Sequence, residues 1–120
     1  MTGGKDAATA ALIESGADVN RPVGAGGYTP LMLAVAQHSK TAAQMILKRG
    51  ADVNARNQGG ITALMIAAAA DQPELVALLV QAGANVDARS ETGETALSIA
   101  RARDYQAVVK LLEQRPSPTT

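Results

Sequence analysis

A repeat with a period of 33 to 34 residues limits what this chain can fold into more than any other feature. One five-residue marker, Gly-Ala-Asp/Asn-Val-Asn/Asp, recurs at residues 16–20, 50–54 and 83–87. A second marker, a threonine two residues before a leucine, recurs at Thr29, Thr62 and Thr95 with a spacing of 33. Because both markers keep their phase, the sequence predicts similar units that stack on their neighbours and share one core.

Each unit is predicted to contain two short helices. A threonine hydroxyl suits the start of each first helix, and Pro30 and Pro73 suit first-turn positions, where the missing amide hydrogen costs nothing. Apolar residues at helical spacing predict first helices over residues 30–37, 63–70 and 96–103, and second helices over 40–49, 73–82 and 105–114. The repeated unit is therefore predicted to be helical.

Two kinds of residue mark the predicted turns. His38, Asp71 and Asp104 stand between the two helices of each unit, and these residue types tolerate a left-handed backbone better than most. Gly50 and Gly83 follow the second helices, where a positive φ costs glycine least. An extended excursion with further glycines then leads from each unit into the next.

The 33-residue period, the Gly-Ala-Asp-Val-Asn segments and the opener Thr-Pro-Leu at residues 29–31 resemble ankyrin repeats over nearly the whole chain. The resemblance implies an all-α fold, an α-solenoid of helix-turn-helix repeats with β-hairpin-like loops between the repeats. It also implies a module that binds another protein. The chain departs from the family opener, Thr-Pro-Leu-His, because Met32, Met65 and Ser98 stand where the family histidine bonds to the adjoining loop.

We expect one ankyrin repeat domain over residues 1–116 and a disordered tail over 117–120. Its predicted divisions are a partial repeat at 1–20, repeats at 21–55 and 56–88, and a C-terminal repeat at 89–116. Counting back one period from Thr29 leaves the first unit without most of its first helix. Two explanations stay open: the sequence is part of a longer chain, or something else covers the edge of the first unit.

The charge balance and the composition exclude several classes of function. Eleven basic and eleven acidic residues give no net charge, so we expect neither a nucleic-acid partner nor a membrane partner, which both require excess positive charge. The chain has no cysteine, which excludes disulfides, thiolate catalysis and cysteine-ligated zinc. Aromatic residues make up 2% of the chain, so the core must consist of closely packed aliphatic side chains.

No group of residues points to catalysis, a metal or a cofactor. His38 is the only histidine, and its neighbours Gln37 and Ser39 do not supply an orienting carboxylate. The aspartates recur once per unit, too far apart to hold a metal ion together. The glycine-rich stretch at residues 24–29 lacks the Gly-Lys-Ser/Thr ending of a phosphate loop. We therefore predict that the protein is not an enzyme and uses no cofactor and no metal.

Two connected surfaces are predicted to bind a partner: the tips of the loops between repeats, and the outward side of the first helices, which lines a concave groove. Tyr28 and Ile61 share one repeat phase, occupied by Glu94 in the third unit, and are the predicted anchors. The alternative for Ile61 is that it packs on the neighbouring hairpin. The predicted partner-binding residues are Tyr28, Gln37, Arg56, Gln58, Ile61, Ala69, Arg89, Glu91, Glu94 and Arg103.

The predicted function is recognition of a partner protein by a rigid surface, as an inhibitor or scaffold of an enzyme. The alternative is a structural fragment that self-associates through the open edge of the N-terminal repeat. The first residues contain no apolar leader, which favours a cytoplasmic location. A bacterial periplasmic location is the alternative if a leader has been removed.

Overall fold

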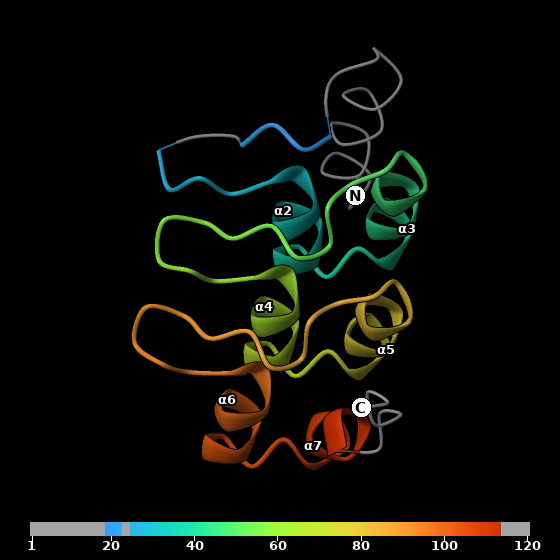
Figure 1. Cartoon of the computed structure of the whole chain (residues 1–120). Coiled ribbons are helices and arrows are strands. Elements are labelled where there is room, and N and C mark those ends of the chain that lie inside the picture. The colour runs from blue at the N-terminus through green and yellow to red at the C-terminus, as the bar shows by residue number, and fades with distance from the viewer. Residues whose placement is uncertain (1–18, 23–24, 114–120) are drawn as a thin grey trace, which may run out of the picture.

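A computed structural model describes residues 19–22 and 25–113 of the chain, and within these ranges it contains six helices in three consecutive pairs. The first helices of the pairs are α2 (Pro30–Ala36), α4 (Ala63–Ala69) and α6 (Ala96–Ala102). The second helices are α3 (Lys40–Lys48), α5 (Pro73–Gln81) and α7 (Gln106–Glu113). Figure 1 shows them as two columns, with the loops between pairs projecting beside the column of first helices.

The helix starts confirm the predicted threonine caps. The hydroxyl oxygens of Thr29, Thr62 and Thr95 accept hydrogen bonds from the main-chain N–H three residues later, at 3.2, 3.3 and 3.0 Å. Thr95 adds the reciprocal bond, because its own N–H donates to the hydroxyl of Ser98 at 2.9 Å. Each of the three first helices ends one residue before its predicted end, since that residue is the C-cap.

The turns inside each helix pair have the predicted left-handed backbone. His38, Asp71 and Asp104 have φ values of 61°, 56° and 60°. Gly50 and Gly83, directly after the second helices, have φ values of 91° and 98°. The same backbone conformation at equivalent positions gives the pairs the same internal geometry, which allows them to stack in register.

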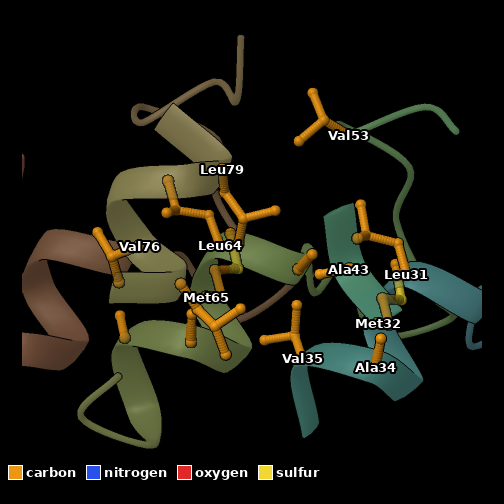
Figure 2. Close-up of a cluster of buried hydrophobic side chains, with 14 of the residues drawn as sticks. Leu31, Met32, Ala34, Val35, Ala43, Val53, Leu64, Met65, Val76 and Leu79 are labelled. Atoms are coloured by element: carbon orange, nitrogen blue, oxygen red, sulfur yellow. The ribbon is translucent and has the colours of Figure 1, made fainter. Parts of the chain in front are cut away.

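The core runs through the stack and is aliphatic. Consecutive first helices contact each other, as do consecutive second helices, so each pair packs on the next. Alanines at these contacts, among them Ala34, Ala67 and Ala100, have no exposed surface, and their small side chains allow the helices to approach closely. Figure 2 shows the larger aliphatic side chains that fill the space between α2, α4 and α5.

Main-chain hydrogen bonds join the loops between pairs to one another. Within the second and third loops, Asn57 N–H donates to the carbonyl of Ile61 at 3.0 Å and Ser90 N–H donates to that of Glu94 at 2.8 Å. Between loops, Gln58 N–H donates to the carbonyl of Gly26 at 3.1 Å, and the equivalent bond one period later joins Glu91 to Gly59 at 3.0 Å. The loops are therefore hairpin-like and laterally bonded, and the predicted fold class is confirmed.

Asparagine side chains hold the start of each loop against the next pair. The side-chain oxygen of Asn54 accepts from Asn85 N–H at 2.6 Å, and its amide donates to the carbonyl of Gly83 at 3.3 Å. Asn20 makes the equivalent two bonds one unit earlier, with Asp52 N–H and the Gly50 carbonyl. These bonds tie successive units together at the sites of the Gly-Ala-Asp-Val-Asn markers.

Some predictions concern residues outside the described part of the chain. They are most of the partial repeat at 1–20 and the tail at 117–120. The predicted limits of the domain and of its repeats stay predictions.

Candidate functional site

A groove of about 560 Å³ opens along the column of first helices, between α4 and α6. Alanines from three helices, at positions 36, 69, 70 and 102, line it together with the longer aliphatic side chains of Ile61, Ile66 and Ile99. Because an alanine side chain stops at Cβ, these positions leave the space that a longer side chain would fill. The groove has the size of pockets that accept a ligand or a few partner side chains.

Two opposite charges border this apolar groove. Glu94 lies at the loop end, one residue before the Thr95 cap of α6, and Arg103 lies at the other end as the C-cap of the same helix. Arg103 Nη1 lies 3.5 Å from the carbonyl oxygen of Ala69, at the limit of a hydrogen bond, in the last turn of α4. The guanidinium therefore reaches across the groove from one helix to the next.

Neither border charge is neutralised by a neighbour. Within the described residues the one ion pair joins Arg101 to Glu113, on α6 and α7. The carboxylate of Glu94 accepts only a long bond from the hydroxyl of Thr92, at 3.4 Å. The groove therefore offers an acid and a base, both exposed to solvent, at opposite ends of an apolar surface.

Four of the ten predicted partner-binding residues line this groove: Ile61, Ala69, Glu94 and Arg103. Ile61 is half-buried and packs against the core, so it contributes to the stability of the fold as well as to the groove wall. Tyr28, of the same repeat phase, is 39% exposed and is the one large apolar side chain exposed in the described part of the chain.

The other predicted residues are exposed but lie outside the groove lining. Gln37 is the C-cap of α2. Arg56 is already engaged, because its Nη2 donates a 2.7 Å hydrogen bond to the main-chain carbonyl of Arg89 in the next loop. Gln58 and Glu91 lie in the loops, where their main-chain N–H groups take part in the bonds between hairpins.

Sequence reasoning missed Met65, Ile66 and Ile99, which also line the groove. The signal was available: Ile66 and Ile99 lie three residues before Ala69 and Ala102, and residues three apart share a helix face. Ile66 and Ile99 are half-buried and also pack against the core, whereas Met65 is a buried core residue.

The titratable residues of the described ranges form no group of three or more His, Asp and Glu side chains that could hold a metal ion. His38 is exposed in the turn between α2 and α3 and does not line the groove. None of the helices in the described ranges is long and apolar enough to cross a membrane.

Stacked helix pairs with laterally bonded loops and a groove along the first helices define a helical-repeat solenoid. A family model described as ankyrin repeats (3 copies) matches residues 1–57 and again 50–119, and the chain belongs to this family. Ankyrin repeats are generally protein–protein interaction modules. No curated protein matches the sequence.

Proposed function

We propose that this protein recognises a partner protein through the groove between α4 and α6 and the neighbouring loop tips. The observation that carries the proposal is the groove itself, an apolar surface with Glu94 and Arg103 at its ends. Excluding water from an apolar surface lowers the free energy of the complex, and the charges at the border of the groove select among partners. Tyr28 adds an exposed aromatic side chain of the type enriched at binding hot spots.

The loops support recognition by a preformed surface. Arg56 bonds to the Arg89 carbonyl, and Asn54 bonds to the start of the following unit. A surface held by such bonds loses little conformational freedom when a partner binds, which favours affinity. A rigid, preformed surface suits a protein that blocks or positions an enzyme. We propose inhibition or scaffolding of an enzyme as the narrower role.

A matched pair of substitutions tests the proposal. Ala102 lines the groove and is exposed, so tryptophan there should fill the groove without disturbing the core. Ala107, equally exposed on α7, lies outside the groove lining and is the control. Wild type, Ala102→Trp and Ala107→Trp are used as bait on extract of the native source, and captured proteins are quantified by mass spectrometry.

We expect a protein that is captured by wild type and Ala107→Trp but depleted at least tenfold by Ala102→Trp. Equal capture by all three baits would place the partner surface elsewhere. Circular dichroism of each variant checks that the helices are unchanged.

The second candidate function is self-association through the open edge of the N-terminal repeat, most of which lies outside the described residues. At the C-terminal end the ion pair of Arg101 and Glu113 occupies repeat phases that hold Ala68 and Val80 in the middle unit. Stacking a further unit there would bury Arg101 and partly bury Glu113, because the equivalent Ala68 is buried and Val80 is half-buried. This opposes association on that side of the described stack. Sedimentation velocity across a range of concentrations separates the two functions, because a binding module remains a monomer.

A further inference from the structure

We propose that the groove selects a short, extended segment of a partner protein that carries an apolar side chain between two oppositely charged residues. This inference rests on the proposed function and adds the chemistry of the ligand. In the groove a basic residue of the segment faces Glu94 and an acidic residue faces Arg103. The apolar side chain between them enters the surface formed by Ile61, Ile66 and Ile99.

The charge requirement follows from the position of the two border residues. Glu94 precedes the first turn of α6 and Arg103 follows its last turn, so the helix itself holds them apart. Within the described residues neither has an ion-pair partner, whereas the nearby Arg101 is paired with Glu113. A partner that brings one charge of each sign therefore satisfies both ends of the groove, and a partner with two like charges repels one end.

These charges are specific to the α6 side of the groove. The residue at the phase of Glu94 is Ile61 in the preceding unit, and the residue at the phase of Arg103 is Ala70. Both of these line the α4 side of the same groove. The wall formed by α4 is therefore apolar throughout, whereas the wall formed by α6 is apolar in the middle and charged at its ends. A complementary ligand carries its charges on the side that faces α6.

The length of α6 sets the spacing of the two charges on the ligand. Glu94 and Arg103 are nine positions apart on either side of this helix, which corresponds to about 13 Å along its axis. An extended chain advances about 3.3 Å per residue, so its charged residues should lie about three or four positions apart. The small alanines at positions 69, 70 and 102 leave space for a main chain to approach closely.

The test is selection of a phage-displayed library of random 12-residue peptides on immobilised protein. Four baits are used: wild type, Glu94→Arg, Arg103→Glu and the groove-filling Ala102→Trp. Glu74→Arg and Lys110→Glu, on exposed positions of α5 and α7, are controls for the change in net charge. Single charge reversals are chosen because their outcome does not depend on the direction in which a peptide lies in the groove.

On wild type and on both controls we expect enriched peptides with one basic and one acidic residue three or four positions apart and an apolar residue between them. Glu94→Arg should enrich pairs of acidic residues at the same spacing, and Arg103→Glu should enrich pairs of basic residues. Ala102→Trp should enrich none of these three kinds of peptide. For a synthetic copy of the best wild-type peptide, fluorescence anisotropy should give a Kd about tenfold higher with either charge reversal.

The inference is overturned if the selected charges are the same on all baits, or if wild type enriches no peptide over Ala102→Trp. The capture experiment, repeated with Glu94→Arg and Arg103→Glu as additional baits, distinguishes this failure from failure of the proposed function. A partner lost on Ala102→Trp but bound equally by both charge-reversed variants would leave the proposed function standing and remove the charge-selected ligand.

Discussion

The side-chain oxygen of Asn54 accepts a 2.6 Å hydrogen bond from the main-chain N–H of Asn85, a residue 31 positions later in the chain. The side-chain NH₂ group of Asn54 donates to the Gly83 carbonyl at 3.3 Å. One side chain thus satisfies two main-chain groups of the following unit, at a position where no helix or strand supplies partners. The bond joins the unit that contains α2 and α3 to the unit that contains α4 and α5. It therefore stabilises the packing of the two units on each other more than the fold of either one.

Asn54→Ala should therefore lower the free energy of unfolding by about 1–3 kcal/mol, because two hydrogen bonds between units are lost. Asn54→Asp keeps the acceptor for Asn85 N–H but places a carboxylate oxygen where the amide donated to the Gly83 carbonyl. It should therefore recover only part of the lost stability. Urea denaturation followed by circular dichroism measures the stability of both variants. The control is Gln81→Ala, a substitution at an exposed position of α5. Equal stability of Asn54→Ala and the control would show that water replaces both bonds.

Asp71→Gly should stabilise the protein. Asp71 has a φ of 56°, a conformation that costs residues with a side chain about 1 kcal/mol or more. Glycine removes this cost, and part of the gain is offset by its larger entropy in the unfolded chain. We expect a net gain of up to about 1 kcal/mol in urea denaturation.

The control for this prediction is the same substitution in a right-handed helix. Glu74→Gly, in the first turn of α5, should destabilise the protein by about 0.5–1 kcal/mol. The two glycine substitutions lie three residues apart and should have opposite signs. A loss of stability in both would mean that the carboxylate of Asp71 makes a larger contribution than the strain of its backbone.

The double variant Arg101→Ala and Glu113→Val should increase self-association. These substitutions give the last unit the residues found at the same phases of the middle unit, Ala68 and Val80. The last described unit would then expose two further apolar side chains in place of an ion pair, and added exposed apolar surface favours association. Sedimentation velocity should show a coefficient that rises with concentration more steeply than in wild type.

Removal of one positive and one negative charge elsewhere is the control for that experiment. Glu74→Ala with Lys110→Ala changes the composition by the same charges at exposed positions of α5 and α7. It should sediment as wild type does. If the Arg101/Glu113 variant also sediments as wild type at every concentration, the ion pair has no part in keeping the end of the stack free.

Tyr28→Ala should weaken binding of a captured partner by about 1–2 kcal/mol and leave the helical circular dichroism signal unchanged. The side chain is 39% exposed and does not pack against the buried core, so its loss should affect the fold less than loss of a core side chain. Ile61→Ala should weaken binding by a similar amount but should also lower stability, because Ile61 packs against the core. Unaltered affinity in both variants, measured by calorimetry, would show that the binding surface lies elsewhere.

The features of the fold that depend on neighbouring residues could be predicted from the sequence. Thr62 and Asp71 indicate a helix start and a left-handed turn by their own chemistry and by their repetition one period away. The bond from Arg56 to the Arg89 carbonyl could not be predicted, because nothing in the sequence states which of several exposed groups a long side chain will reach. Long-range polar contacts of this kind depend on the distance between loops after stacking.

The candidate site was predictable to a similar extent. The repeat phase led to Ala69 and Arg103 on the groove side of the first helices, where the structure places them. Helix periodicity also places Ile66 and Ile99 on that face, three residues before Ala69 and Ala102. It does not show how far a half-buried isoleucine there is exposed to the groove, because this depends on the size of the residues around it. Here those neighbours are alanines, and the space they leave exposes one side of each isoleucine.

One wall of the groove belongs to α6 and the other to α4, so the groove exists only while their two helix pairs are packed on each other. A repeat array can open locally, one unit at a time. Opening of α6 and α7 would remove Ile99 and Arg103 from the groove while the remaining pairs stay folded. Ligand occupancy and closure of this pair are therefore thermodynamically linked, and a bound segment should slow amide exchange in α6 and α7 before it affects α2 or α3.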